Sequence, residues 1–194
     1  MKVDFKTSKL YYGFPVLLIG YKDEKWRYNV TTSSSSYSLG NMLTIGIKKE
    51  SNCAKQILKY RQFTVNIPSK EMIRQVELCG FHPSMNKIGL ADLTYDPGVY
   101  VDAPVLDDCL LSLECEVDHA VTEGGYVNFI ATIKRRAIEE NLLDEQGNFK
   151  STDFNPIYFL GDGSGRIFRY LHEPDVSALG QNSDCCNNDD NSCG

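Results

Sequence analysis

Short runs of apolar residues, separated by turn-forming residues, recur along most of the chain. Residues 14–21 form one run, and residues 26–32 resume with apolar side chains at every second position after a charged break. This alternation is typical of strands, and the break between the two runs predicts a β-hairpin. Similar patterns predict further strands at residues 42–47, 63–67, 110–117, 127–137, 157–160 and 166–171.

Two short helices are predicted between these strands. Residues 52–59 form the first, with Ser51 as its cap and three apolar side chains facing inward: Ala54, Ile57 and Leu58. Residues 70–79 form the second, with Ser69 as its cap. Residues 81–103 are rich in Pro, Gly, Asn and Asp and predict a long irregular segment with at most one helical turn. Segments of this kind often carry function.

The pattern as a whole predicts a mainly β fold. About seven short strands joined by short links favour an antiparallel barrel with helices packed at its openings. A chain of 194 residues is long enough for one domain with a sizeable core, which we place at residues 1–175. Residues 176–194 form a polar, cysteine-containing tail that we expect to be flexible.

Charge and hydropathy narrow the classes of partner. The formal net charge is −6, and no surplus of Lys and Arg gathers in one segment, which argues against nucleic-acid binding. The longest apolar stretch, residues 14–20, is too short to span a bilayer, and the first residues lack the apolar core of a secretory signal. We therefore expect no membrane partner and a cytoplasmic location.

The seven cysteines fall into two groups. Four lie in apolar or helical patterns and read as reduced, buried thiols: Cys53, Cys79, Cys109 and Cys115. The other three lie in the polar tail and match no common zinc spacing: Cys185, Cys186 and Cys193. An inert terminus is favoured for this tail over a redox-active or metal-scavenging one. His82 and His119 have no second histidine at ligand spacing, so neither a metal site nor a nucleophile triad is predicted.

Two further motifs favour structural interpretations. Glu114, Glu116 and Asp118 alternate with apolar residues and share one face of a predicted strand, where a solvated outer face is favoured over an acid–base pair. The glycine-rich residues 161–165 follow a strand, as a dinucleotide fingerprint does, but a strand-like segment follows them instead of a helix. A hairpin turn is predicted there.

A hydroxyl-rich segment is the strongest candidate for binding chemistry. Residues 29–36 read Asn-Val-Thr-Thr-Ser-Ser-Ser-Ser, and Lys48 and Lys49 lie just before the helix that Ser51 caps. Hydroxyl groups, ammonium groups and free N–H groups at a helix start together suit a phosphate. Serine-rich connections are usually solvated loops, so the residues alone favour that interpretation over a phosphate site.

Four segments, in this order and spacing, resemble the flavin reductase-like family of FMN-binding split barrels, and most of all its flavoredoxin branch. They are Phe-Pro-Val-Leu-Leu-Ile at residues 14–19 with residues 28–34; the strand at 42–47 with its helix and Phe-Thr-Val-Asn-Ile-Pro at 63–68; Cys79-Gly80 with Asn86-Lys87; and Ala103-Pro104 with residues 113–117. The resemblance covers residues 11–171 and implies a split β-barrel with FMN as cofactor.

The resemblance also implies which residues bind FMN: Asn29, Thr32, Ser33, Ser34, Ser35, Lys48, Lys49, Ser51, Cys53, Asn66 and Lys87. Within this set, residues 32–35 line the isoalloxazine edge and the phosphate, and the loop at residues 48–53 closes over the phosphate. Lys87 corresponds to a lysine often found at the flavin site. In such proteins the flavin lies in a cleft at a homodimer interface, so we expect the partner subunit to complete the site.

The sequence departs from the family pattern at three places. Ser51 and Cys53 stand where the family commonly has an arginine and then a threonine, so phosphate binding would depend on Lys48 or Lys49. The segment at residues 81–86 is shorter than the corresponding segment in the family, which weakens the match of Lys87 to the family's lysine. Tyr126 stands where a histidine is frequent in the family, which argues against direct use of NAD(P)H.

The functional hypothesis is an FMN-dependent oxidoreductase or electron-transfer protein that takes electrons from NAD(P)H or a redox protein. The flavin would carry the redox chemistry, and the chain would supply position and electrostatics. The alternatives are a flavin-binding or redox-sensing module that uses the tail cysteines, and an interaction protein with an empty barrel.

Overall fold

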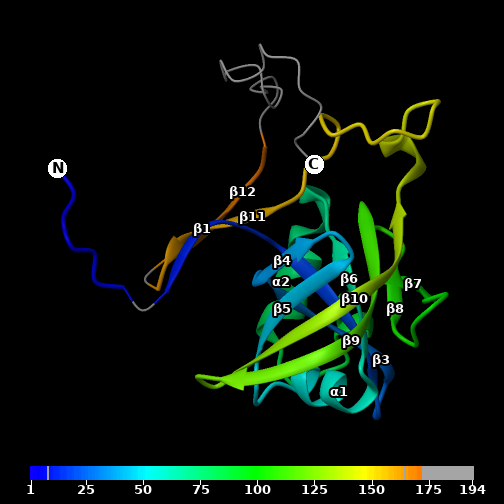
Figure 1. Cartoon of the computed structure of the whole chain (residues 1–194), viewed down its shortest axis with the longest axis horizontal. Helices are drawn as coiled ribbons and strands as arrows, with labels where there is room; N and C mark the ends of the chain where they lie inside the picture. The colour runs from blue at the N-terminus through cyan, green and yellow to red at the C-terminus, as the bar shows by residue number, and fades with distance from the viewer. Residues whose placement is uncertain (8, 164, 172–194) are drawn as a thin grey trace, which may run out of the picture.

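The structure is a computed structural model that describes residues 1–7, 9–163 and 165–171. Within these residues, seven antiparallel strands form the main sheet (Figure 1). Their spatial order is β3 (Arg27–Ser33), β2 (Leu17–Asp23), β6 (Gln62–Ile67), β9 (Leu111–Glu123), β10 (Tyr126–Ile138), β5 (Met42–Lys48) and β4 (Ser36–Leu39). The mainly β, antiparallel fold predicted from the sequence is confirmed.

Two smaller sheets accompany the main one. The strands β1 (Leu10–Pro15), β11 (Tyr158–Asp162) and β12 (Arg166–Arg169) form a three-stranded sheet that extends away from the barrel (Figure 1). The strands β7 (Tyr95–Pro97) and β8 (Pro104–Leu106) pair within the long segment at residues 81–103 and just after it. The strand β7 was missed by the sequence pattern because it is short and lies among Asp, Pro and Gly residues.

The helices are short and lie against the main sheet. They are α1 (Asn52–Tyr60), the 3₁₀ turn η1 (Lys70–Met72), α2 (Ile73–Phe81), α3 (Lys87–Leu90) and the 3₁₀ turn η2 (Glu140–Leu142). Ser51 caps α1 as predicted, because its Oγ accepts the Ala54 N–H at 3.1 Å. The prediction for Leu58 is wrong: its side chain is exposed, and Cys53 and Gln56 are buried instead.

The strand β2 lies between two apolar cores. Leu17, Ile19 and Tyr21 point into the barrel, where they pack with residues of β5, β6, β9, β10 and α1. Val16 and Leu18 point the other way, toward the helices α2 and α3. Successive strand residues face opposite sides of a sheet, and here both sides are buried. Each such buried aliphatic side chain stabilises the fold by about 1.5–3 kcal/mol.

The predicted run at residues 14–21 belongs to two different strands. Its first residues end β1, which pairs with β11, and its later residues form β2, which pairs with β3. Val16 lies at the join, and its N–H donates to the Ile157 carbonyl at 2.8 Å. The hairpin of β2 and β3 is confirmed, but the chain changes sheet before it. This change brings β1 beside β11 and β12.

Three further predictions concern the tail, the cysteines and membrane helices. The predicted flexible tail at residues 176–194, with Cys185, Cys186 and Cys193, lies outside the described residues. The four other cysteines are buried free thiols, as predicted: Cys53, Cys79, Cys109 and Cys115. In the part of the chain that is described, no helix is long and apolar enough to cross a membrane.

Candidate functional site

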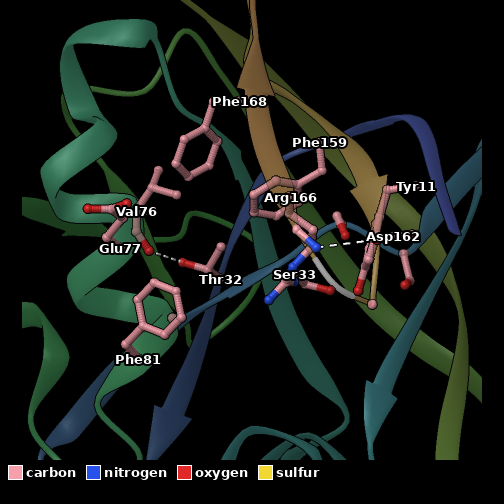
Figure 2. A pocket seen from close by; sticks show the side chains of 15 residues that line it. Tyr11, Thr32, Ser33, Val76, Glu77, Phe81, Phe159, Asp162, Arg166 and Phe168 are labelled. Carbon is pink, nitrogen blue, oxygen red and sulfur yellow. Dashed lines mark hydrogen bonds between the residues drawn. The ribbon is translucent and has the colours of Figure 1, made fainter. Parts of the chain in front are cut away.

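Two hollows meet at Gly80, near the end of α2. The larger hollow has a volume of about 510 Å³ and lies between the end of β3, the helix α2 and the three-stranded sheet (Figure 2). The smaller hollow has a volume of about 220 Å³ and lies between β3, the start of α1 and the start of α3. Gly80 lines both, so the two hollows are neighbours on either side of this residue.

The hydroxyl-rich segment forms one side of the larger hollow. Thr32, Ser33, Ser34 and Ser35 all line it. Thr32 Oγ1 donates to the Val76 carbonyl at 2.6 Å, which fixes β3 against α2. The Ser35 carbonyl accepts the Gly46 N–H at 2.9 Å, so the backbone of this connection is also held. The segment is therefore an ordered wall that presents hydroxyl groups to the larger hollow.

Aromatic side chains form the facing side of the larger hollow. Tyr11 comes from β1, Phe159 from β11 and Phe168 from β12 (Figure 2). The Phe159 and Phe168 rings stack with centroids 5.0 Å apart, and Tyr11 meets Phe159 edge-on at 6.0 Å. Offset stacks and edge contacts of this kind are favourable ring arrangements. The hollow can therefore accommodate a planar ring between hydroxyl groups and aromatic faces.

Lys87 is the cation of the smaller hollow. It begins α3, and only 7% of its surface is exposed. Its Nζ donates to Thr31 Oγ1 at 2.9 Å, the one hydrogen bond that this ammonium makes among the described residues. Burial lowers the pKa of Lys87, because the charged form loses solvation. An ammonium group has three donors, so this buried cation is suited to a bound anion.

Asn29 fixes the backbone around Lys87. Its Oδ1 accepts the Lys87 N–H at 3.0 Å, and its Nδ2 donates to the Met85 carbonyl at 3.0 Å. A side chain of β3 therefore holds the segment before α3 in place. Asn29 lines the smaller hollow but uses its amide to position Lys87.

The start of α1 completes the smaller hollow, where Ser51 and Cys53 line it. Helix starts carry unsatisfied N–H groups and a partial positive charge, which favour an anion. Burial raises the pKa of the Cys53 thiol to about 12, and that of Cys79 to about 11. Both are neutral thiols near pH 7 and therefore poor nucleophiles. Cys53 lines the smaller hollow, and Cys79 lies in the apolar core between β2 and the helices α2 and α3.

Eight of the predicted FMN-binding residues line the two hollows: Thr32, Ser33, Ser34 and Ser35 the larger, and Asn29, Ser51, Cys53 and Lys87 the smaller. Lys48 and Lys49 are exposed and line neither hollow, although Glu50 and Ser51 beside them line the smaller one. The structure brings the predicted phosphate loop to the site through Ser51 and places its two lysines outside.

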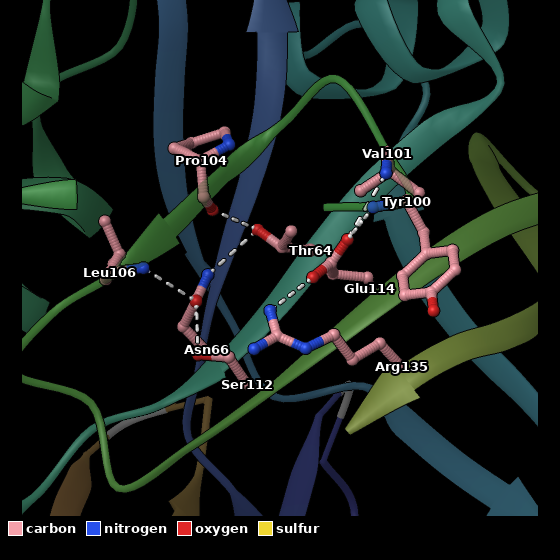
Figure 3. Close-up of polar contacts among 9 residues, drawn as sticks. All are labelled: Thr64, Asn66, Tyr100, Val101, Pro104, Leu106, Ser112, Glu114 and Arg135. Carbon is pink, nitrogen blue, oxygen red and sulfur yellow. Dashed lines mark hydrogen bonds and ion pairs between the residues drawn. The ribbon is translucent and has the colours of Figure 1, made fainter. Parts of the chain in front are cut away.

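Asn66 has a structural role that the sequence did not indicate. It is fully buried in β6 and lines neither hollow (Figure 3). Its Nδ2 donates to the Leu18 carbonyl and Thr64 Oγ1, and its Oδ1 accepts the Leu106 N–H and the Ser112 hydroxyl. The amide is saturated by protein groups on β2, β6, β8 and β9. We therefore reassign Asn66 from cofactor binding to holding these strands together.

The sequence did not indicate the lining residues that come from the two ends of the domain, among them Tyr11, Phe159, Arg166 and Phe168. Their strands were partly predicted, but the pairing of β1 with β11 depends on contacts between the two ends of the chain.

Comparisons with known proteins agree with this geometry. The flavin reductase like domain family matches residues 11–157. Flavoredoxin of Desulfovibrio vulgaris (Miyazaki F) has a TM-score of 0.83 at 22% identity, covering 94% of this chain and 100% of that chain. Flavoredoxin from Methanosarcina acetivorans has a TM-score of 0.81 at 23% identity, covering 93% of this chain and 97% of that chain.

A third similar structure is an FMN-binding protein from Thermus thermophilus, with a TM-score of 0.73 at 20% identity over 92% of this chain and 97% of that chain. These structural likenesses establish the fold, which is the split barrel of flavin reductase-like proteins. The family match spans well over half of the sequence and includes the hydroxyl segment and Lys87. The chain therefore belongs to the flavin reductase like domain family.

Proposed function

We propose that this chain binds one FMN per subunit and passes electrons from NAD(P)H or a redox protein to an acceptor. The observation that carries the proposal is Lys87, a buried ammonium that lines one hollow, next to a second hollow that the hydroxyl segment lines. Family membership and the similarity to an FMN-binding protein support the choice of cofactor.

The two hollows fit the two ends of FMN. The smaller hollow, with Lys87, Ser51 and the start of α1, has the donors and positive charge that a phosphate needs. The larger hollow has room and aromatic walls for a planar ring, and its volume lies within the range of about 300–1,000 Å³ typical of small-molecule sites. Thr32, Ser33, Ser34 and Ser35 would offer hydrogen bonds along the edge of that ring.

Bound FMN would supply the redox chemistry, storing two electrons from a donor until an acceptor takes them. The chain's own residues would bind the cofactor, orient it and shield it from water. Lys87 neutralises negative charge, Asn29 keeps Lys87 in place, and the Thr32 bond to α2 keeps the hydroxyl wall in register. The neutral Cys53 and Cys79 thiols exclude water beneath the site without joining the redox reaction.

The proposal is tested by the visible absorption spectrum of the purified protein, followed by anaerobic addition of NADH and then NADPH. We expect flavin bands, either as purified or after FMN is added. Bleaching by either nucleotide identifies a flavin reductase, and bands that persist until a protein donor is added identify a flavoredoxin-like carrier. If no FMN binds at any concentration up to millimolar, the proposed function is wrong.

We also propose that the chain works as a homodimer. The three-stranded sheet extends from the barrel (Figure 1). Its exposed large apolar side chains include Leu10, Tyr12 and Ile167. Large apolar side chains exposed together on one small sheet are typical of protein interfaces. The molar mass in solution, measured by light scattering, is expected to be twice the 21.8 kDa of one chain. A mass of one chain at micromolar concentration would contradict this proposal.

A further inference from the structure

A buried tyrosine of the barrel core also lines the smaller hollow. Tyr21 lies near the end of β2, is 1% exposed and packs in the core that the barrel encloses. It lines the smaller hollow together with Ser51 and Lys87. A buried tyrosine has an apolar ring and a polar tip, and its hydroxyl usually has a hydrogen-bond partner. The partners of the Tyr21 hydroxyl therefore decide what it can offer to a ligand.

Asp23 fixes the orientation of the Asn52 side chain beside this tyrosine. A carboxylate only accepts hydrogen bonds, and Asp23 Oδ2 lies 2.6 Å from Asn52 Nδ2. The other end of the Asn52 amide accepts, because its Oδ1 lies 3.3 Å from Gln56 Nε2. The second N–H of Asn52 Nδ2 reaches Tyr21 Oη at 3.4 Å. Asn52 therefore donates to the tyrosine, and the phenol proton needs a different acceptor.

The phenol proton of Tyr21 has no acceptor among residues 1–7, 9–163 and 165–171. Burial raises the pKa of Tyr21 above its ordinary value, and the nearby Cys53 and Asp23 act in the same direction, so the hydroxyl keeps this proton near neutral pH. A buried donor without an acceptor destabilises a fold. The proton is thus available to a group that enters the hollow.

The other groups around the hollow favour an anion as that acceptor. Lys87 brings a buried ammonium group. Asn52 and Cys53 are the first two residues of α1, whose N–H groups have no partner within the helix. Glu50 also lines the hollow, but its side chain is mostly exposed and pairs with a lysine of α1, so solvent screens its charge. A compact anion with several oxygens, such as phosphate, suits these three kinds of donor.

We infer that the Tyr21 hydroxyl donates a hydrogen bond to the phosphate group that Lys87 neutralises, and that this bond favours a phosphorylated ligand over its dephosphorylated form. In the proposed function this phosphate is that of FMN, so the inference rests on that function and adds a binding residue to it. Tyr21 was not among the predicted FMN-binding residues, because it ends the apolar run at residues 14–21 and resembles an ordinary core residue.

The test compares FMN with riboflavin, which has the same ring and ribityl chain but no phosphate. Tyr21→Phe keeps the aromatic ring in the core and removes only the hydroxyl. We expect this variant to bind FMN about tenfold more weakly, as for the loss of one hydrogen bond to a charged group, and to bind riboflavin within about twofold of the unaltered protein. Quenching of flavin fluorescence gives both dissociation constants, and riboflavin binding also shows that the variant is folded.

Tyr28→Phe is the matched control. Tyr28 is a buried tyrosine of the neighbouring strand β3, but its hydroxyl donates to Asp102 at 2.5 Å and it lines neither hollow. The affinity of Tyr28→Phe for FMN is expected to lie within about twofold of the unaltered protein. The inference is wrong if both variants lose FMN affinity equally. It is also wrong if Tyr21→Phe weakens riboflavin as much as FMN, because the hydroxyl would then support the core and not the phosphate.

Inorganic phosphate separates this inference from the proposed function. The rise in melting temperature that phosphate causes in the full chain without flavin is measured for the unaltered protein and both variants. We expect a smaller rise in Tyr21→Phe and an unchanged rise in Tyr28→Phe. This result in a protein that binds no FMN would overturn the proposed function and support the Tyr21 hydrogen bond. Unchanged FMN affinity in Tyr21→Phe would overturn the inference and leave the proposed function intact.

Discussion

Replacing Lys87 by methionine is expected to weaken FMN binding by about 10- to 100-fold, the loss that follows from removing a hydrogen bond between charged groups. Methionine keeps most of the length of the side chain and removes the ammonium that faces the smaller hollow. Quenching of FMN fluorescence during titration gives the dissociation constant. The stability of the fold should not fall. The buried Lys87 ammonium has lost its solvation and gained few contacts in return, so removing it can raise the melting temperature.

The matched control is Lys49→Met, which removes an exposed lysine from the predicted phosphate loop. Because Lys49 does not line either hollow, its dissociation constant for FMN is expected to change by no more than about twofold. If Lys49→Met weakens binding as much as Lys87→Met, the phosphate is held by the exposed loop, and our assignment of Lys87 is wrong.

The pH dependence of FMN affinity follows from the same residue. Burial lowers the pKa of Lys87 in the protein without ligand, and a phosphate dianion beside it would raise that pKa. Binding is then strongest where Lys87 is already protonated, and it weakens as the pH rises above the pKa of the free protein, in the range below the ordinary lysine value near 10.5. Lys87→Met should remove this alkaline decline. The decline would persist in the variant if another group were responsible.

Local pattern was enough to predict the strands but not how they join. The period of two at residues 26–32 and the charged break before it specify the β2–β3 hairpin, which needs only neighbouring residues. The run at residues 14–21 is apolar because its later part is buried on both faces, and the one local mark of the change of sheet is Pro15, directly before Val16. The pairing of β1 with β11 joins residues about 150 positions apart, beyond the reach of local patterns.

The candidate site was predicted where it depends on residue type and missed where it depends on burial. Hydroxyl groups, a helix start and a lysine signal phosphate chemistry in any sequence, and they line the hollows here. Asn66 looked like a ligand residue, but contacts from β8 and β9 saturate its amide. Glu114 was assigned to a solvated face with Glu116 and Asp118, yet it is 1% exposed, because the segment at residues 98–103 folds over it alone.

Glu114 holds that segment against the barrel. Its Oε2 accepts the N–H groups of Tyr100 at 2.6 Å and Val101 at 3.3 Å, and its Oε1 accepts a bond from Arg135 at 2.9 Å (Figure 3). Burial acts to raise the pKa of Glu114, but the Tyr100 N–H and the Arg135 guanidinium outweigh it, so the pKa lies below its ordinary value. The carboxylate is thus charged and buried, and it accepts all its hydrogen bonds from the segment at residues 98–103 and from the strand β10.

Glu114→Ala is therefore expected to lower the free energy of unfolding by about 3 kcal/mol, because the two N–H groups and the guanidinium lose their partner together. Glu116→Ala, two residues along the same strand, removes only an exposed ion pair with Lys134 and should cost no more than about 0.5 kcal/mol. Denaturant unfolding near neutral pH measures both changes. Equal losses of stability in the two variants would mean that Glu114 behaves like a residue of the solvated face, as the sequence predicted.

The free energy of unfolding of the unaltered protein and of Glu114→Ala should differ in a pH-dependent way. This dependence is an independent check that the Glu114 carboxyl group is charged. A carboxyl group whose pKa is lowered by folding stabilises the protein above its unfolded pKa, near 4.3 for glutamate, and loses that contribution as the pH falls through the lower, folded value. The gap between the unaltered protein and Glu114→Ala should be full at neutral pH and narrow progressively below about pH 4. A gap that stays constant down to about pH 2 would mean that the neutral acid holds the loop as well as the carboxylate does, and that the ion pair with Arg135 contributes nothing.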